Sequence, residues 1–286
     1  MTGIQVGFDA WIKPELTAIG CHEGDLKHHK ASTISGQRPM PALNFEGDYG
    51  NSYRTSIRDS VPGYDVLHEI ALATVHSMSS QAKSVLVVGP GPGEQLPDLL
   101  KACPNAELTV LEPSERMLSL CREVISSDPG RERCVLIQGE LEHNMVQTLN
   151  LNGWDLVVCH NVLHLFEAKK QVQLLRLLAQ CTGRNGLLLL SGYSEPSDPS
   201  TTEQIMEIGL QRLRDRDLNE EQVSAIRDSR NRVVFSVDSH RVSTVLTSEK
   251  LTPALQLYQG LFIKLWASRR QGEGLNAAPA FESVME

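Results

Sequence analysis

Short apolar runs alternate with amphipathic segments through the middle of the chain. Runs of β-branched and other apolar residues predict five buried strands, at 85–89, 107–111, 134–138, 155–159 and 186–191. Segments with helical spacing lie beside them, at 65–78, 94–103, 114–125 and 168–181. This alternation predicts an α/β, Rossmann-like fold with a mostly parallel, doubly wound sheet, in which ligands bind beyond the carboxyl ends of the strands.

The pattern changes on both sides of this region. Residues 1–40 are punctuated by Gly and Pro, residues 195–232 are polar with helical spacing, and residues 256–267 are apolar and β-prone. We therefore expect the following organisation. An N-terminal arm or lid covers 1–60, the sheet domain covers 61–270 with a helical insert at 195–232 and closing antiparallel strands, and a flexible tail covers 271–286.

Composition narrows the class of protein. The 286 residues suffice for one sizeable domain with a lid, and 41% of them are hydrophobic. A formal charge of −8 without a Lys/Arg block disfavours nucleic acid as the main partner. The six cysteines lack zinc-type spacing, and we expect no metal site. No signal peptide or membrane-spanning run is recognised, which predicts a cytoplasmic location and no membrane partner.

A glycine-rich corner, Gly89-Pro90-Gly91-Pro92-Gly93, follows the first predicted strand. Its three glycines permit positive φ and close approach of a ligand to the backbone. Its prolines remove two N–H donors, and no Gly-Lys-Ser/Thr follows, so a phosphate cradle is disfavoured. A neutral nucleoside with an amino-acid tail fits better, which is the form of S-adenosylmethionine (SAM). The alternative is an ordinary loop of a Rossmann-like sheet.

Acidic residues end the next two predicted strands. Glu112 lies about twenty residues beyond the glycine corner, where a carboxylate accepts hydrogen bonds from a ribose diol. Glu140 ends the third strand. These carboxylates do not distinguish SAM from NAD. However, the corner is not of the G-x-G-x-x-G form, so an NAD-linked reductase is a remote alternative.

Together with the exit of the fourth strand, Asp155 to His164, these motifs resemble class I SAM-dependent methyltransferases over about residues 60–270. The resemblance implies a seven-stranded sheet and SAM as cosubstrate or sole substrate. It also places adenine contacts near Glu140 and implies a homodimer.

Two outlying motifs resemble carboxy-SAM synthase, a family that makes carboxy-SAM from SAM and prephenate. They are Ser60-Val61-Pro62-Gly63-Tyr64 and Ser224-Ala225-Ile226-Arg227. The resemblance implies that Arg227 grips the added carboxylate. It implies SAM contacts at Tyr64, Gly89, Pro90, Gly91, Glu112, Pro113, Glu140, Leu141 and His160, to which the corner adds Gly93. The sequence departs from that family in having His160 in place of Asn, and Gly-Pro-Gly in place of Gly-Cys-Ser.

Four residues are candidates for chemistry. His160, Asn161 and Tyr193 follow strands 4 and 5, where acceptors and general bases lie, and Arg227 comes from the resemblance. An imidazole has a suitable unperturbed pKa for proton removal, although His160 could equally hold the SAM carboxylate. The tyrosine Tyr64 lies in an aromatic-rich segment, and its ring could face a sulfonium or simply pack the segment.

The prediction from the sequence is a SAM-dependent transferase that methylates a small molecule of specialised metabolism. A second hypothesis starts from Val87, which stands where class I enzymes commonly carry an acid near the SAM ammonium. An apolar residue there would favour a neutral amine, which could close on its own Cγ to give azetidine-2-carboxylate and methylthioadenosine. Carboxy-SAM synthesis is a third hypothesis, and a non-catalytic SAM-binding scaffold is a fourth.

Overall fold

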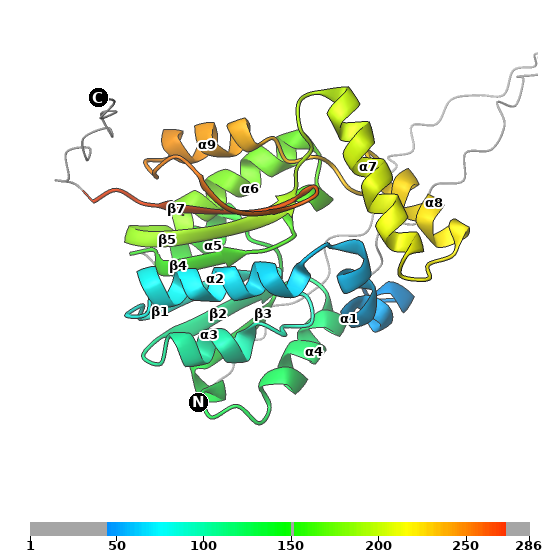
Figure 1. The fold of residues 1–286 in the computed structure, drawn as a ribbon. Helices are drawn as coiled ribbons and strands as arrows, with labels where there is room; N and C mark the ends of the chain where they lie inside the picture. Colours follow the sequence, from blue (N-terminus) through cyan, green and yellow to red (C-terminus); the bar gives the residue numbers. More distant parts are fainter. Residues whose placement is uncertain (1–44, 150–151, 273–286) are drawn as a thin grey trace, which may run out of the picture. The chain divides into compact units, whose positions relative to one another are not determined.

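Seven strands form one sheet in the computed structural model, which describes residues 45–149 and 152–272 (Figure 1). In chain order the strands are β1 (Ser84–Val88), β2 (Glu107–Glu112), β3 (Cys134–Gln138), β4 (Trp154–Cys159), β5 (Thr182–Tyr193), β6 (Leu255–Gly260) and β7 (Ile263–Arg269). Their spatial order is β3-β2-β1-β4-β5-β7-β6, with β1 to β5 parallel and β7 antiparallel to both of its neighbours. The predicted mostly parallel sheet is confirmed.

Helices cover both faces of the sheet and extend beyond its carboxyl edge. The described helices are α1 (Asp48–Ser60), α2 (Tyr64–Met78), α3 (Leu96–Ala102), α4 (Glu115–Ile125), α5 (His143–Leu149), α6 (Ala168–Cys181), α7 (Pro199–Arg214), α8 (Glu220–Ser229) and α9 (Ser239–Ser248). Residues of α2, α3 and α4 share one core cluster, and residues of α5, α6 and α9 pack in another. No described helix combines the length and apolar character needed to span a bilayer.

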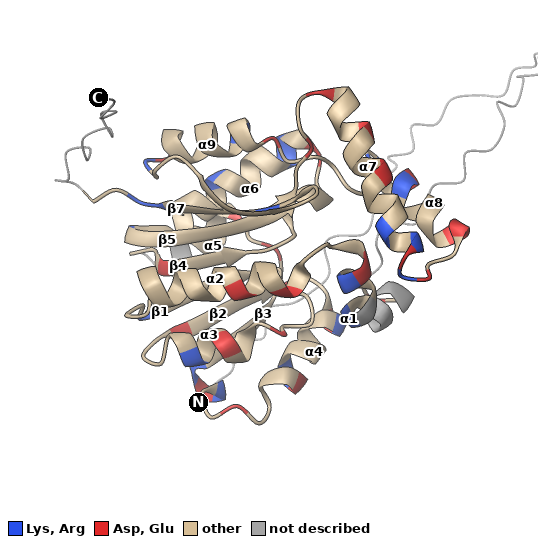
Figure 2. Ribbon diagram, in the orientation of Figure 1, with Lys and Arg blue, Asp and Glu red and all other residues tan. Residues whose placement is uncertain are grey.

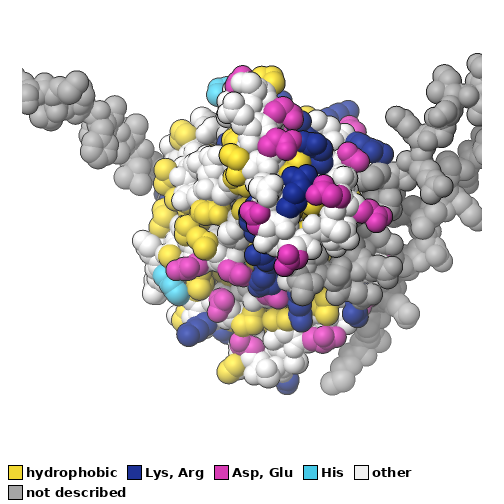
Figure 3. All heavy atoms as spheres, turned by 45° about the vertical axis from the view of Figure 1, so that its right-hand side comes forward, with side chains coloured by type: hydrophobic (Ala, Val, Ile, Leu, Met, Phe, Trp, Pro, Cys, Tyr) yellow, Lys and Arg dark blue, Asp and Glu magenta, His cyan; other side chains and the backbone are white. Residues whose placement is uncertain are grey.

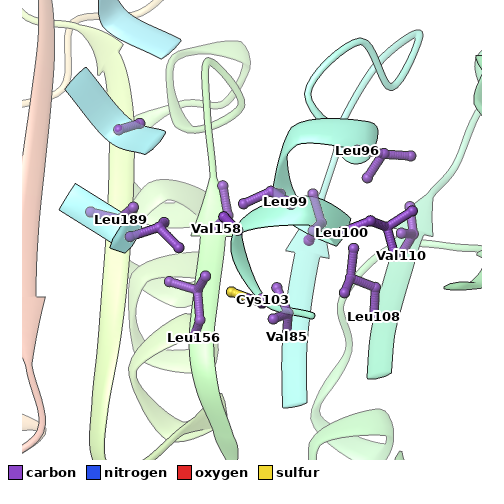
Figure 4. Close-up of a cluster of buried hydrophobic side chains, with 14 of the residues drawn as sticks. Val85, Leu96, Leu99, Leu100, Cys103, Leu108, Val110, Leu156, Val158 and Leu189 are labelled. Carbon is purple, nitrogen blue, oxygen red and sulfur yellow. The ribbon is translucent and has the colours of Figure 1, made fainter. Parts of the chain in front are cut away.

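Alternation along the strands builds these two clusters, because successive side chains of a strand point to opposite faces. In β4, Leu156 and Val158 join the cluster on the α3 side, whereas Val157 and Cys159 join the other. Figure 4 shows the first cluster, in which side chains of β1, β2, β4 and β5 meet those of α3. Both faces of the central strands are buried, as near-continuous apolar runs predict.

Three described helices were not predicted from the sequence, namely α1, α5 and α9. The last of these contains four β-branched residues, which lower helix propensity. Its start is nevertheless capped by Asp238, whose carboxylate accepts from the N–H groups of His240 at 2.9 Å and Arg241 at 3.2 Å. Its Val242, Val245 and Leu246 are buried against the sheet side, so tertiary packing overrides propensity.

The segment predicted as a helical insert, 195–232, contains α7 and α8. Each helix begins at a side-chain cap. Asp198 accepts from the N–H of Thr201 at 2.8 Å, and Asn219 and Gln222 form a reciprocal capping box. Of the predicted arm, residues 1–44 lie outside the described residues, as do residues 273–286 of the predicted tail. Residues 48–60 of the predicted arm form α1.

Candidate active site

A cavity of ≈ 590 Å³ opens at the carboxyl ends of β1 to β4, and we call it the first cavity. Its volume lies in the range of about 300–1,000 Å³ that is typical of small-molecule sites. Eight of the residues predicted to bind cofactor or substrate line it: Gly89, Gly91, Glu112, Pro113, Glu140, Leu141, His160 and Asn161. The structure therefore brings the ends of four strands to one site, as a doubly wound sheet requires.

The glycine corner gives this cavity its floor. Gly89, Gly91 and Gly93 have φ values of 64°, 59° and 74°, which are left-handed conformations that favour glycine. The N–H of Gly93 donates to the carbonyl of Pro90 at 3.2 Å and closes the turn. Pro90 and Gly93 are buried behind the corner, so they shape the loop while Gly89 and Gly91 face the cavity.

Glu112 is a buried carboxylate at the cavity wall, with a relative exposure of 5%. Its oxygens accept one hydrogen bond from the N–H of Gly91 at 3.2 Å and one from that of Ser114 at 3.0 Å. A carboxylate has about four lone-pair positions, so capacity remains for the two hydroxyls of a ribose. Burial raises the pKa of Glu112 to about 7, against the opposing effect of the two backbone N–H groups. The carboxylate, its free acceptor capacity and the open glycine floor fit an adenosyl group.

The far end of the first cavity is less buried. Glu140 is an exposed carboxylate that pairs with Lys170 at 3.4 Å. The ammonium of Lys170 also lies 4.3 Å from the centre of the Phe166 ring. Leu141 is buried and, with Leu165, adds an apolar wall. An apolar slot edged by charged residues suits a flat adenine, with polar contacts at its rim.

Asn161 stands where the first cavity meets a second one. Its φ is 58°, a left-handed value that Asn tolerates better than most residues, at the exit of β4. Its N–H donates to Ser191, to the carbonyl oxygen at 3.1 Å and to Oγ at 3.0 Å. The Oγ of Ser191 in turn donates to Asn161 Oδ1 at 3.3 Å. The side chain is thus held by its oxygen and lines both cavities.

The second cavity has a volume of ≈ 380 Å³ and is mostly apolar. Its walls come from α1, α7, α8, the segment after α8, and β7. The apolar side chains from α7, α8 and the turn between β6 and β7 include Met206, Leu210, Leu213, Ile226 and Phe262. Charged residues on α1, α7 and α8 lie close together in Figure 2. On the face turned forward in Figure 3, basic and acidic side chains are interspersed, so this face offers no single-sign patch for a polyanion.

Two arginines line the second cavity, and both are occupied. Arg230 donates to Glu195 at 2.5 Å and to Glu203 at 2.8 Å. Arg212 donates to the backbone carbonyls of Asp59 at 2.6 Å and Arg58 at 3.2 Å, which end α1. These contacts tie α1 to α7. The cavity consequently offers a largely apolar, charge-balanced environment.

Tyr193 lines the second cavity, and both its hydroxyl and its ring have defined partners. Its hydroxyl donates to Glu195 at 2.6 Å, and its ring lies 5.1 Å from that of Phe262. Burial raises the pKa of Tyr193 well above its usual value, and Glu195 adds to that shift. Arg227, by contrast, is exposed on α8 and pairs with Glu207 of α7. The structure does not bring Arg227 to the cavities, and Arg230 occupies the place next to Tyr193 and Glu195.

His160 is turned toward α2 rather than toward the second cavity. The centroid of its ring lies 5.4 Å from that of His68. The centroid of the His68 ring lies 4.6 Å from that of Tyr64. These three residues line a third cavity of ≈ 360 Å³ together with Arg58 and Glu94. Among the described residues, His160 Nδ1 and His68 Nε2 are buried without a hydrogen-bond partner. Burial lowers the pKa of both imidazoles, that of His68 to about 4, so both rings are neutral near pH 7.

Sequence reasoning missed three residues of the site. His68, Arg230 and His164 were not singled out as site residues. His164 Nδ1 accepts the N–H of Tyr193 at 3.2 Å, and the residue lines the second cavity. The sequence signal for His164 was its place in the fourth-strand exit motif. No such signal marked His68, whose partner His160 is distant in the chain.

A family model described as a methyltransferase domain matches residues 85–186. No curated protein matches the chain. Among solved structures, an O-methyltransferase family protein from Burkholderia thailandensis is 14% identical, with a TM-score of 0.56 over 81% of this chain and 64% of that one. The chain thus spans less than two thirds of that structure. Magnesium protoporphyrin IX methyltransferase from Synechocystis PCC 6803, with bound S-adenosylhomocysteine (SAH), is also 14% identical, with a TM-score of 0.56 over 79% of this chain and 96% of that one.

The family match covers the glycine corner, Glu112, Glu140 and Asn161, so the matched residues contain most of the wall of the first cavity. At 14% identity the two structures establish the fold. The domain match and the cavity chemistry support the predicted SAM-dependent transferase with SAM as its cofactor. Residues 85–186 match a methyltransferase-domain model, and the chain shares its α/β fold with these two methyltransferase structures.

Proposed function

We propose that the protein transfers a methyl group from SAM to a small, largely apolar molecule that carries a hydroxyl. One observation carries this proposal: two cavities of suitable size adjoin each other at Asn161. One is walled by a carboxylate and a glycine corner, and the other is mostly apolar. Methyl transfer needs such a pair, since donor and acceptor must meet in line at one point.

The residues of the first cavity would hold the adenosyl end of SAM. Glu112 would accept hydrogen bonds from the ribose, and Leu141 with Glu140 would bound the adenine. Bound there, SAM supplies a methyl group made electrophilic by the sulfonium. The neutral imidazole of His160 and the ring of Tyr64 line the third cavity, and we assign them to the methionyl end.

The residues of the second cavity would hold and orient the acceptor. The acceptor oxygen attacks the methyl carbon, the carbon–sulfur bond breaks, and its electron pair stays on sulfur to leave SAH. The hydroxyl proton must pass to a base. Tyr193 and Glu195 offer that route, because Tyr193 already donates its own proton to Glu195 and its oxygen can accept another. Asn161, fixed by Ser191, positions the reacting groups at the junction.

The competing reactions have less support. Carboxy-SAM synthesis needs the arginine predicted at 227, which pairs with Glu207 at the surface. The cyclase hypothesis started from Val87, which is fully buried in the core cluster with Val85. The predicted homodimer and the link to specialised metabolism stay predictions.

Mass spectrometry of the purified chain with SAM tests the proposal. SAH should form when SAM is supplied with a panel of phenols and should not form with SAM alone. Methylthioadenosine and a four-membered imino acid from SAM alone would establish cyclisation instead. Carboxy-SAM formed with prephenate would establish the other reaction, and SAM binding without turnover by any acceptor would favour a non-catalytic role.

A further inference from the structure

His164 occupies the wall of the second cavity in a defined orientation. It lies in the short helical turn Leu163–Leu165 that follows β4. Its ring nitrogen Nδ1 accepts the backbone N–H of Tyr193 at 3.2 Å, at the end of β5. Its backbone carbonyl accepts the N–H of Phe235 at 2.8 Å. Gln171 is buried and holds the same region, because its amide donates to the carbonyls of Phe166 and Phe235 at 2.9 and 3.3 Å.

This hydrogen bond fixes where the imidazole carries its proton. A nitrogen that accepts an N–H must present a lone pair, so Nδ1 is unprotonated and the single proton of a neutral ring sits on Nε2. A charged ring would place a second proton on Nδ1, facing the Tyr193 N–H. Burial agrees with the neutral form, since it lowers the pKa of His164 to about 4. Within residues 45–149 and 152–272, no hydrogen-bond partner occupies Nε2.

The lining of the second cavity indicates what kind of ligand the Nε2–H of His164 would contact. The cavity wall is mostly apolar, and its two arginines are engaged, Arg230 by Glu195 and Glu203 and Arg212 by backbone carbonyls. Tyr193 directs its hydroxyl proton to Glu195. An ionised ligand would therefore lose its hydration without gaining a counter-ion, whereas a neutral ring system loses little.

We infer that His164 is a specificity residue, whose Nε2–H donates a hydrogen bond to a phenolic or carbonyl oxygen of a neutral aromatic acceptor in the second cavity. The inference rests on the proposed function, because it names the acceptor class of the same site. His164 acts here as a donor that selects the ligand and does not remove a proton. An acceptor that offers only a donor group leaves the Nε2–H unpaired and binds more weakly.

Two fluorescent probes of nearly equal size test this assignment. 1-Naphthol offers an oxygen that accepts hydrogen bonds, whereas 1-aminonaphthalene offers a nitrogen that accepts poorly. Each is titrated into the full chain saturated with SAH. We expect 1-naphthol to bind about fivefold to tenfold more tightly, which is the preference that one additional neutral hydrogen bond gives. Equal affinity of the two probes, or binding of neither at millimolar concentration, would overturn the assignment.

Variants of His164 separate selection from simple packing. His164→Gln keeps an oxygen for the Tyr193 N–H and an N–H₂ donor for the ligand, so the preference for 1-naphthol should persist. His164→Leu has neither group, and the preference should vanish while affinity for SAH stays unchanged. Preference that survives in His164→Leu would contradict the inference.

A measurement on the unaltered chain covers the case in which His164→Leu fails to fold. In a long-range ¹⁵N–¹H spectrum of histidine-labelled protein, His164 should show the Nε2–H tautomer, and that signal should move when 1-naphthol is added. The Nδ1–H tautomer, or a signal that 1-naphthol leaves in place, would contradict the inference. Because these assays read binding with SAH present, failure of methyl transfer in the mass-spectrometric experiment would leave their outcome intact and separately readable.

Discussion

The first and second cavities adjoin, yet they are built in different ways. The first is lined largely by residues at or just beyond the carboxyl ends of strands, such as Gly89, Glu112, Leu141 and Asn161. The second takes its walls from α1, α7, α8 and β7, segments that are far apart in the chain. Backbone geometry at the sheet edge therefore positions the first cavity, the proposed donor site, whereas packing between helices positions the second, the proposed acceptor site. Changes to one cavity should then affect its own ligand more than the ligand of the other.

The largest effect is expected at Gly93, behind the first cavity. A Cβ there would lie 2.7 Å from Cys121 Sγ and 3.2 Å from the Cys121 backbone, at a φ of +74°. Strain and overpacking together should lower the free energy of unfolding by about 2–4 kcal/mol in Gly93→Ala. Urea denaturation measures this loss.

Gly91→Ala is the matched control. Its φ is +59°, but its Cβ would meet the Tyr53 ring at an ordinary 3.6 Å. Only backbone strain remains, so the loss of stability should be about 1 kcal/mol. An equal loss of stability in the two variants would contradict the account in which Gly93 is packed against the protein interior whereas Gly91 faces the first cavity.

Glu112→Ala should weaken SAM binding by about 1–3 kcal/mol, because charge-assisted hydrogen bonds to the ribose are lost. Isothermal titration calorimetry gives this difference directly. Affinity for 1-naphthol with SAH at saturation should change little, since Glu112 does not line the second cavity. Unchanged SAM affinity would remove Glu112 from the ribose site.

The SAM affinity should also depend on pH through Glu112. Burial raises its pKa to about 7 in the free protein, whereas ribose hydroxyls donate to the ionised form. SAM binding must therefore release a proton below pH 7, and affinity should fall by up to about tenfold per pH unit as the pH drops. Above pH 7 it should level off.

Glu112→Gln provides the control for this titration, because an amide at 112 has no proton to release. Its SAM affinity should be flat over the same interval. The raised pKa has a consequence for folding as well. Stability of the free protein should decrease as the pH rises through about 7, since the folded state disfavours the charged carboxylate. A wild-type affinity that is flat between pH 6 and 8 would contradict the raised pKa.

The smallest effect is expected where α1 is tied to α7. Arg212→Ala removes the two hydrogen bonds to the end of α1, at 2.6 and 3.2 Å. Because α1 walls the second cavity, 1-naphthol affinity should fall about threefold, which corresponds to less than the loss of one hydrogen bond. SAH affinity should stay within about twofold.

Arg216→Ala tests whether loss of a surface ion pair to α1 affects ligand binding as loss of the Arg212 hydrogen bonds does. Arg216 pairs with the Asp59 carboxylate of α1 at 2.6 Å, but both side chains are partly exposed. Such pairs contribute about 0–1 kcal/mol, so ligand affinities should barely change. Loss of SAH and 1-naphthol affinity to the same extent in Arg212→Ala would erase the distinction between the two cavities.

The meeting of residues at the first cavity could be predicted from the sequence because they lie at the ends of strands that apolar runs reveal. Strand ends of a parallel sheet share one edge, so the glycine corner, Glu112 and Glu140 must meet. The acceptor side could not. Arg227 and Arg230 both follow Val223 at helical spacing. The sequence pattern therefore does not indicate which of the two arginines lines the second cavity. The choice depends on acidic partners, which are Glu207 for Arg227 and Glu195 for Arg230.

His160 illustrates the same limit. It lines the first cavity, but alternation along the strand turns its ring to the α2 side, against His68. Helix α1 was missed because it contains Gly50 and is rich in polar residues, so no apolar stripe marks it. Its buried Ile57 packs in the core cluster shared with α2, a contact that only the folded chain supplies.

A crystal structure of the chain soaked with SAH tests the central claim most directly. The account predicts ribose hydroxyls within hydrogen-bond distance of Glu112, and a sulfur atom beside Asn161 that faces the second cavity. An adenosyl group in the second or third cavity, or a first cavity free of SAH at millimolar ligand, would contradict it.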